Sequence, residues 1–564
     1  MQQDTFIAED DTQIVFRYWH ATQPLNRVII LLHRGHEHSG RMQELAEFFC
    51  RQGYHVYAWD ARGNGLSGGE RDAASSFNVF ARDLDQFVNL VSQQSGVAIH
   101  NMFVVASSMG AVIAASWLHD HAPKIRGVIL ATAAFEIQLY VPFATPLLKL
   151  ARRFGWMPRV SSYVKSKVLT HDRMQQKLYN HDPLISGGIS TDLLLDTLYT
   201  GQRLIANAGA IDTPMLVLCA GKDWVVKRSS QRKFFQRLTS NWKEWRYYPD
   251  CYHALFHEDS RQIVFRDCLD FIDRVFSAKP QNTDYQQAHQ RGYSRDTYDA
   301  LRLPSLNPVF PLTKWAMATL GQHSDGIKLA HQCGFDSGRS LDYVYENQPR
   351  GRNALGRIID SIYLNSPGWA GIRRRKDLID QLLEQQLERI KDNGNILDIA
   401  AGNGRYLLPP LTRYPNVQAE LRDYDANNVK LIRQSGEALQ LQHLDVVQAD
   451  AFAPQSYAVE NKFDVAIISG LFELFGDNPT IQVALDGVAK QLKPGGILIY
   501  TNQAWHPQQE FIARTLTNHQ GEPWVMRCRS QAEMDQLVSL SGLKKIQTQV
   551  EDAGIFSVSV AVKP

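Results

Sequence analysis

The sequence lacks several features that would assign a protein to a class at once. Its 564 residues include only six cysteines, and none of them forms a CxxC pair or stands at the spacing of metal ligands. It contains no internal repeat and no low-complexity tract. A disulfide framework and a repeat architecture are therefore not expected, and the scattered cysteines favour a reducing compartment.

An excess of one charge is also absent. The 60 basic and 58 acidic residues leave a formal net charge of +2, which argues against a nucleic-acid-binding surface. The N-terminus is acidic and polar, whereas a signal peptide is basic and then apolar. The longest apolar stretch, 102–118, is interrupted by serines and a glycine and predicts a buried strand and helix. We expect a cytoplasmic protein without a nucleic-acid partner, whose membrane contact, if any, is peripheral and at the inner face.

The length predicts at least two domains. Within residues 1–276, short apolar runs alternate with helical patterns, which indicates a parallel sheet covered on both faces. The rhythm breaks at about 135–205, where we expect an inserted cap. Residues 277–347 are polar and contain several prolines, which is typical of a connection between domains. The α/β rhythm then restarts within residues 348–564.

The strongest single motif is ASSMG at residues 106–110, between the strand MFVV and a helix. Small residues around a serine at such a turn are typical of a nucleophile elbow, so Ser108 is the candidate nucleophile. Asp223, after the strand MLVLCAG, and His253, after WRYYP, follow in the order that α/β-hydrolases use for acid and base. Alone, Asp223 could equally be a helix cap and His253 a loop histidine.

The loop HRGHEH, residues 33–38, follows the strand VIILL. Such a loop supplies backbone donors to a tetrahedral intermediate, and we expect the N–H groups of Gly35 and Met109 to form the oxyanion hole. His33 and His38 could be read as metal ligands. Because no cluster of carboxylates accompanies them, a packing role is preferred and no metal is expected.

With these residues assembled, the first domain resembles the monoglyceride lipase and lysophospholipase branch of the α/β-hydrolases, also grouped with serine aminopeptidase-like hydrolases. The matching stretches include HRGHEHSGRMQELAEFF, YAWDARGNGLSGG, AGKDWVV and, within the cap, LTHDRMQQKLYNHDPLI. The resemblance implies an α/β-hydrolase fold, a lipid-like monoacyl ester as substrate, and Glu37 and Arg41 near its headgroup. Arg34 stands where the family usually has glycine, and it either meets a phosphate, which would favour a lysophospholipid, or changes the loop.

The cap segment 143–169 mixes leucine, phenylalanine and tryptophan with basic residues. This pattern is typical of a helix that lies on an anionic bilayer, and equally of a solvated basic face above an apolar tunnel. The basic residues are Lys149, Arg152, Arg153, Arg159, Lys165 and Lys167.

In the second domain, NILDIAAGNGRYL places Asp398 at a strand end and Gly402 and Gly404 at the start of a helix. Glycine turns of this kind allow a nucleotide-like ligand to approach the backbone closely. The next strand ends in Asp423 and Asp425, where a carboxylate can bind ribose hydroxyls.

Asp450 and Ala451, after the third strand, resemble the adenine-recognising element of class I methyltransferases. FDVAIISGLFELF and LKPGGILIYTNQ resemble the fourth and fifth strand regions of the same family, which implies a Rossmann-like fold and S-adenosyl-L-methionine (SAM) as cofactor. An NAD-binding domain is the rival interpretation, but the LKPGG turn and the C-terminal strand pair favour the methyltransferase. The whole chain resembles bacterial proteins in which a hydrolase is fused to such a domain.

The methyl acceptor is not named by these motifs. Tyr500, Asn502, His506 and Glu473 are candidates to align or deprotonate it, and each can equally be structural. The basic cluster 373–376 is expected to open an amphipathic helix, where it either binds an anion or forms a solvated face.

Two alternatives to a bifunctional ester hydrolase and methyltransferase stay open. The first domain could be an inactive lipid-binding module that serves the methyltransferase, because a fold alone does not establish chemistry. It could also be a thioesterase, since the same machinery cleaves thioesters.

Overall fold

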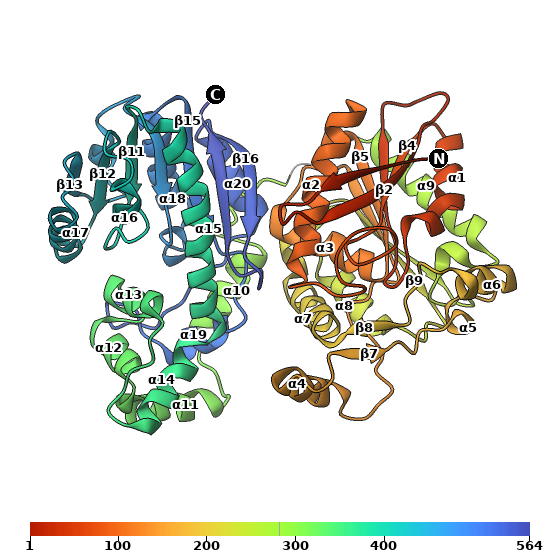
Figure 1. Cartoon of the computed structure of the whole chain (residues 1–564), viewed down its shortest axis with the longest axis horizontal. Coiled ribbons are helices and arrows are strands. Elements are labelled where there is room, and N and C mark those ends of the chain that lie inside the picture. Colours follow the sequence, from red (N-terminus) through yellow and green to blue (C-terminus); the bar gives the residue numbers. More distant parts are fainter. Residues whose placement is uncertain (281–282) are drawn as a thin grey trace. The chain divides into compact units, whose positions relative to one another are not determined.

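The computed structural model describes residues 1–280 and 283–564. The chain divides into two compact units, Met1–Thr283 and Asp284–Pro564, each built around a sheet (Figure 1). The expected fold classes, an α/β-hydrolase fold followed by a Rossmann-like fold, are confirmed.

The first unit contains an eight-stranded sheet within residues 1–280, in the order β1-β2-β4-β3-β5-β6-β9-β10. β1, β2 and β4 pair antiparallel, and β4 to β10 pair in parallel. The strands are β1 Gln2–Ile7, β2 Gln13–Trp19, β3 Val28–Leu32, β4 His55–Trp59, β5 Met102–Ser107, β6 Gly127–Ala131, β9 Met215–Ala220 and β10 Lys243–Tyr248.

Helices cover both faces of this sheet because its central strands are apolar on both sides. In β3, Ile30 and Leu32 pack into one core with α2, α3, α7 and α8, while Ile29 and Leu31 pack into the other with α1 and α9. The helices are α1 Gln43–Arg51, α2 Asn78–Ser95, α3 Met109–His121, α7 Thr191–Asn207, α8 Arg228–Arg237 and α9 Arg261–Ser277.

The cap is the insertion between β6 and β9. It contains α4 Ala144–Phe154, a two-stranded sheet of β7 Arg159–Ser161 and β8 Gly188–Ser190, α5 Ser166–Leu169, α6 Arg173–His181 and finally α7. Leu148 of α4 packs on Leu194 and Leu195 of α7, which attaches the outer helix of the cap to the unit.

The second unit contains a seven-stranded sheet in the order β13-β12-β11-β14-β15-β17-β16 within residues 283–564. β13 to β15 pair in parallel, and β17 runs antiparallel between β15 and β16. The strands are β11 Asn395–Ile399, β12 Gln418–Asp423, β13 Leu444–Gln448, β14 Phe463–Ile468, β15 Leu492–Asn502, β16 Lys544–Val550 and β17 Ser557–Val562.

Helices also cover both faces of this second sheet. Apolar residues of α15 and α17 pack on one face, and those of α18 and α20 pack on the other. The helices are α15 Pro367–Ile390, α16 Leu408–Leu411, α17 Ala426–Ala438, α18 Asn478–Gln491, α19 Gln509–Thr515 and α20 Gln531–Leu540.

The segment expected as a polar connection, 277–347, differs from that expectation. From Asp284 onward it belongs to the second unit and forms helices, which together with α14 and the start of α15 pack on the segment after β15. The helices at 293–302, 325–333 and 338–346 each carry only a narrow apolar stripe, so much of the segment is polar in composition although it is folded. The helices are α10 Tyr293–Arg302, α11 Val309–Thr319, α12 Asp325–Cys333, α13 Gly338–Glu346 and α14 Ala354–Leu364.

Candidate active sites

Ser108 stands at the tight turn between β5 and α3. Its backbone has φ 54° and ψ −115°, in the left-handed half of conformational space that a serine rarely adopts. The turn also demands a glycine at Gly110, because a Cβ there would lie 2.5 Å from the carbonyl oxygen of His33. This backbone presents the serine side chain at the carboxyl end of the sheet.

The three residues predicted as a triad lie together. His253 Nε2 is 2.9 Å from Ser108 Oγ, and His253 Nδ1 is 2.9 Å from Asp223 Oδ2. The other carboxylate oxygen of Asp223 accepts the N–H groups of Val225 and Val226, which fixes its orientation. His253 is 1% exposed and Ser108 is 7% exposed. The arrangement can pass a proton from a nucleophilic hydroxyl to a held imidazole.

Gly35 and Met109 also come together, since a Cβ on Gly35 would lie 3.7 Å from the Met109 side chain. Met109 is the first residue of α3, so its N–H group has no partner within the helix. Gly35 therefore lies close to Met109, the residue after Ser108, and the oxyanion hole formed by their N–H groups stays a prediction.

The residues expected near the headgroup form a buried ion cluster. Glu37 pairs with Arg34, and Arg41 Nε lies 3.6 Å from the same carboxylate. Burial raises the pKa of Glu37, but Arg34 and its neighbours outweigh burial and hold the pKa below its ordinary value. Arg34 is thus engaged by Glu37 instead of standing free for a phosphate.

The two histidines of this loop are held by protein atoms. His33 contacts the carbonyl oxygen of Arg34 and accepts the N–H of Ala61. His38 accepts the N–H of Gly40 and contacts Asp182 of the cap at 2.8 Å. Both rings use both nitrogens in these contacts, in keeping with a packing role.

In the second unit, the glycine turn follows β11. Gly402 and Gly404 have φ values of 57° and 66°, and a Cβ added to Gly402 would meet no atom within 4 Å. Ala400, where a glycine is common in this motif, adopts φ 56° and carries the strain that a glycine would avoid. The space above Gly402 leaves the backbone open to a ligand.

The predicted carboxylates after β12 and β13 differ in their surroundings. Asp423 is buried and accepts the N–H groups of Gly402 and Asp425, so it holds the glycine turn in place. Asp425 is exposed and caps α17. Asp450 is exposed beside the half-buried Ala451. Among these, Asp425 and Asp450 are the carboxylates that solvent or a ligand can reach.

Asp398 is fully buried at the end of β11. Tyr406 donates a hydrogen bond of 2.7 Å to its Oδ1, while its Oδ2 has no partner within the described part of the chain. Burial, with a smaller contribution from Asp423, raises the pKa of Asp398 to about 8, against the lowering effect of Tyr406. An unpaired buried oxygen of this kind indicates a site for a donor that the protein itself does not supply.

Helix α13 contributes residues to this site that the sequence did not indicate. Asp342 pairs with Asn403 and with Arg405, both in the glycine turn. The apolar spacing within α13 is the local signal for this helix, but the polar composition of the surrounding segment predicts a connection between domains. The first residues after the turn are thereby held by a helix about sixty residues earlier in the chain.

The basic cluster 373–376 does not open a helix, because α15 begins at Pro367. Arg375 points into the unit, is 3% exposed, and pairs with Glu473 at 2.9 Å. The expectation of a solvated or anion-binding cluster at a helix start is therefore wrong for Arg375. Gly368 and Gly371 lie in the first turns of the helix and, because glycine disfavours helices, weaken its sequence signal there. Both glycines allow close contact, with His506 and Phe556 respectively.

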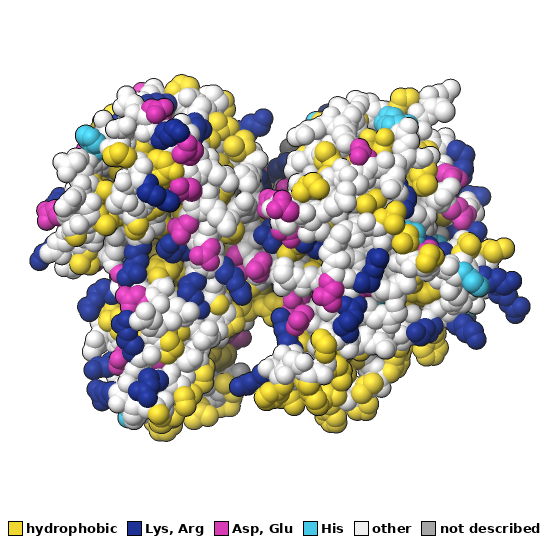
Figure 2. Space-filling model, in the orientation of Figure 1, with side chains coloured by type: hydrophobic (Ala, Val, Ile, Leu, Met, Phe, Trp, Pro, Cys, Tyr) yellow, Lys and Arg dark blue, Asp and Glu magenta, His cyan; other side chains and the backbone are white. Residues whose placement is uncertain are grey.

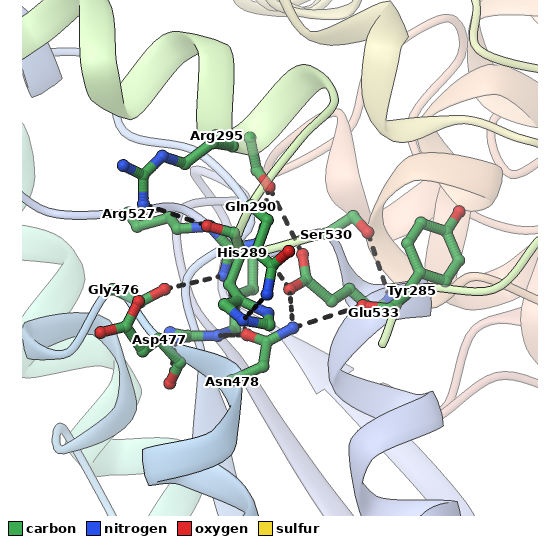
Figure 3. A network of polar contacts seen from close by, with 12 residues as sticks. Tyr285, His289, Gln290, Arg295, Gly476, Asp477, Asn478, Arg527, Ser530 and Glu533 are labelled. Atoms are coloured by element: carbon green, nitrogen blue, oxygen red, sulfur yellow. Dashed lines mark hydrogen bonds and ion pairs between the residues drawn. The ribbon is translucent and has the colours of Figure 1, made fainter. Parts of the chain in front are cut away.

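The loop that carries Glu473 is held by two buried arginines. Arg529 donates to the carbonyl oxygens of Phe472 and Phe475, at 2.6 and 2.5 Å. Arg527 bonds to Asn478 and pairs with Glu533, in a network that also reaches Tyr285 (Figure 3). Glu533 is only six residues from Arg527, but the other partners lie about fifty residues or more away, so no local pattern predicts this network.

Two of the residues considered for the methyl acceptor have structural partners. Tyr500 is fully buried, with its hydroxyl 3.4 Å from Asp535. Asn502 donates to the carbonyl oxygen of Arg529. His506 and Glu473 both line a cavity of about 310 Å³, and Glu473 is also paired with Arg375.

Comparison with protein families matches both units. The family described as "Serine aminopeptidase, S33" matches residues 23–260, and the family described as "Putative methyltransferase" matches residues 268–563. The second match therefore includes the helices α10–α13.

Individual relatives follow the same division. The "Uncharacterized protein YnbC" of Escherichia coli (strain K12) is 44% identical over 99% of this chain and 98% of its own length. The "Monoglyceride lipase" of Rattus norvegicus is 30% identical over 44% of this chain and 82% of its own length. The "Phospholipase YtpA" of Bacillus subtilis (strain 168) is 26% identical over 45% of this chain and 98% of its own length.

Proposed function

Because the chain belongs to a family that joins an S33-type, monoglyceride lipase-like hydrolase unit to a unit of the methyltransferase family named above, we propose that it is a serine ester hydrolase fused to a SAM-dependent methyltransferase. The observation that carries the first half is the chain of contacts from Ser108 through His253 to Asp223.

The hydrolase acts through an acyl-enzyme. Ser108 Oγ attacks the ester carbonyl while His253 Nε2 takes the hydroxyl proton, and His253 then returns that proton to the leaving alcohol. Asp223 holds the imidazole, and the N–H groups of Gly35 and Met109 donate to the oxyanion. A water molecule, deprotonated by His253, then attacks the acyl-enzyme, which releases the carboxylic acid and restores Ser108.

The proposed substrate is a monoacyl ester of lipid type. The ion pair with Glu37 engages Arg34, the arginine of the oxyanion loop, so it favours a neutral glycerol headgroup over a phosphate. Release of free fatty acid from monooleoylglycerol and from lysophosphatidylcholine tests this preference. Faster hydrolysis of the phospholipid would contradict it.

We further propose that the cap contacts an anionic membrane peripherally. Side chains of α4 and its flanks are exposed and apolar, among them Phe143 at 84% and Phe154 at 70% exposure, and they gather at the lower edge of this unit in the space-filling view (Figure 2). Arg152 is paired with Asp192 and Asp196, but Lys149 and Arg153 on the same helix are exposed. Among the described residues, no helix combines the length and apolar character that a membrane crossing needs.

Replacing Phe143 and Phe154 together with aspartate is expected to lower binding to vesicles containing anionic phosphatidylglycerol by at least about tenfold, because each phenylalanine contributes about 1.5–3 kcal/mol when buried. Co-sedimentation with vesicles measures the effect. Ile263→Asp, at a 57% exposed position of α9, is the matched control and should bind as the unchanged chain does. Equal binding by both variants would refute the cap as the contact.

The residues around the glycine turn fit SAM. Gly402 leaves open space for a ligand, Asp398 carries an unpaired oxygen for its cationic ammonium group, Asp425 is available to ribose hydroxyls, and Asp450 and Ala451 to adenine. When bound, SAM supplies a methyl group on a sulfonium sulfur. Binding of SAM to the full chain, measured by calorimetry, tests the methyltransferase half of the proposal.

Binding of SAM at pH 7 is expected to release a proton from Asp398. With a pKa of about 8, this carboxyl is protonated in the free protein, and a neighbouring ammonium group favours the ionised form. We expect binding to release up to about 0.9 proton per site at pH 7. At about pH 9.5 we expect almost no release, because the carboxyl is already ionised in the free protein. Calorimetry in buffers of different ionisation enthalpy measures the count. Asp398→Asn is the control, and an undiminished proton release in that variant would exclude this carboxyl as the source.

A further inference from the structure

The cavity in the second unit has a mainly apolar wall. It lies among α11–α15 and the segment after β15, and its volume of about 310 Å³ suits a small organic molecule. Trp369 stacks on Trp524 with ring centroids 6.0 Å apart, and Tyr363 meets Trp369 edge-on. Flat aromatic walls of this kind favour a flat apolar ligand.

One end of the cavity is polar and incompletely paired. Arg375 and Glu473 both line it and are joined by one contact, from Nη1 to Oε1. The remaining Glu473 Oε2 and Arg375 Nε are buried and have no hydrogen-bond partner in residues 1–280 and 283–564. A buried acceptor and a buried donor that lack partners are costly unless a ligand satisfies them.

This polar end lies next to the glycine turn. Ile399 of β11 and Ile468 of β14 are directly paired in the parallel sheet, so the turn 400–404 and the loop 469–473 leave the sheet side by side. The guanidinium of Arg375 lies against the backbone of Gly470 within that loop. A molecule in the cavity therefore places its polar group toward the proposed SAM site.

We propose that this cavity binds the methyl acceptor, and that the acceptor is an apolar aromatic molecule with a phenolic hydroxyl. This inference rests on the proposed SAM-dependent methyltransferase function. A hydroxyl donates one hydrogen bond and accepts others, so it matches the open Glu473 oxygen and the open Arg375 N–H together. Because Arg375 and Glu473 already balance each other's charge, a neutral hydroxyl adds no uncompensated charge at this end, whereas a carboxylate or an ammonium group would.

Glu473 acts as the base in this arrangement. The phenol proton passes to Glu473 Oε2, an oxygen electron pair forms the new C–O bond to the methyl carbon, and the electrons of the broken S–CH₃ bond remain on the sulfur of the thioether product. A phenol suits this base because its proton is far more acidic than that of an alcohol.

His506 gives the wall a donor and no positive charge. Burial lowers the pKa of His506 to about 4, so the ring is neutral near pH 7. Its Nδ1 accepts the N–H of Gln508, which leaves the proton on Nε2. The ring therefore does not compete with Glu473 for the proton of the acceptor.

The probe for this site is 2-naphthol, titrated calorimetrically into the full chain saturated with the demethylated cofactor. It is expected to bind at least about tenfold more tightly than naphthalene, which lacks the hydroxyl. Absence of 2-naphthol binding would overturn the proposal. Equal binding of both would overturn the role of the polar end. Binding of the demethylated cofactor, measured first, tests the SAM site separately, so its failure is distinguishable.

Ile362 offers a variant that leaves the core intact. Ile362 lines the cavity yet is 70% exposed. Ile362→Trp should therefore narrow the entrance of the cavity and weaken the binding of 2-naphthol at least about tenfold, without loss of folding. Ile358→Trp, one turn earlier on α14, is 59% exposed and is the matched control. Equal effects of both substitutions would overturn the assignment of the cavity.

Glu473→Gln tests the base. It should reduce transfer of a labelled methyl group to 2-naphthol by at least about 100-fold while the demethylated cofactor still binds. Because Arg375 then loses its charged partner, thermal unfolding of this variant is measured alongside. If the variant does not fold, the comparison of Ile362→Trp with Ile358→Trp tests the cavity instead. An unchanged transfer rate in folded Glu473→Gln would exclude this carboxylate as the base.

Discussion

Replacing Ser108 with alanine is expected to abolish labelling by a fluorophosphonate probe and to lower the rate of p-nitrophenyl ester hydrolysis by on the order of 10⁴- to 10⁶-fold. The reason is that His253 Nε2, 2.9 Å from Ser108 Oγ, would have no hydroxyl left to deprotonate. Labelling is read on a denaturing gel, and hydrolysis by absorbance of the released nitrophenolate.

Ser107→Ala is the matched control, since it removes the same hydroxyl from the residue before and lies outside the triad. Labelling that persists in Ser108→Ala would refute the nucleophile. Absence of labelling and of turnover in the folded, unchanged chain would instead support the alternative of an inactive lipid-binding module. Turnover of thioesters but not of oxygen esters would identify a thioesterase.

Replacing Gly402 with valine is expected to weaken SAM binding by more than about 100-fold. The new side chain would occupy the space above the turn that is free of protein atoms within 4 Å, and a φ of 57° does not suit a β-branched residue. Calorimetry with SAM measures the change in Kd.

Gly495 provides a control for backbone strain in the same unit. It has φ 76° and equally open space around its Cβ position, but it lies at the turn within β15, away from the glycine motif. Gly495→Val should therefore carry a similar strain and leave SAM binding unchanged. Ser108→Ala should also leave the Kd within about twofold, because the two sites lie in separate cores. Equal SAM affinity in Gly402→Val would point to a Rossmann-like domain with another role.

The sequence predicted those features that depend on local pattern. The strand before Ser108, the turn around it and the helix after it are adjacent in the chain, and their apolar spacing and small residues are readable directly. Asp223 and His253 were recognised because each follows a strand of the same sheet. The same reasoning located the glycine turn after β11.

What sequence reasoning missed depends on contacts between distant segments. The helices within 284–347 bury their stripes against Trp505, Ile512 and Trp524, which follow about 200 residues later. The sequence places Arg375 in a cluster expected to be solvated or anion-binding, because its partner Glu473 is about 100 residues away and gives no local signal. The spacing of apolar residues within one segment does not predict which distant residues that segment will contact.

The loop around Arg34 illustrates a further limit. Its sequence neighbours Glu37 and Arg41 were expected to face the substrate, but the charge of Glu37 is shared between two arginines. Whether a charged side chain meets a ligand or another side chain depends on rotamers and burial, and spacing alone does not decide it.

The backbone at Ser108 lowers the stability of the first unit. A non-glycine residue at φ 54° costs about 1–3 kcal/mol, which a glycine at the same position would recover. For the folding of the unit alone, glycine at position 108 would therefore be the more stable choice. The strained backbone at Ser108 is thus a cost in stability that accompanies the placement of its hydroxyl 2.9 Å from His253 Nε2.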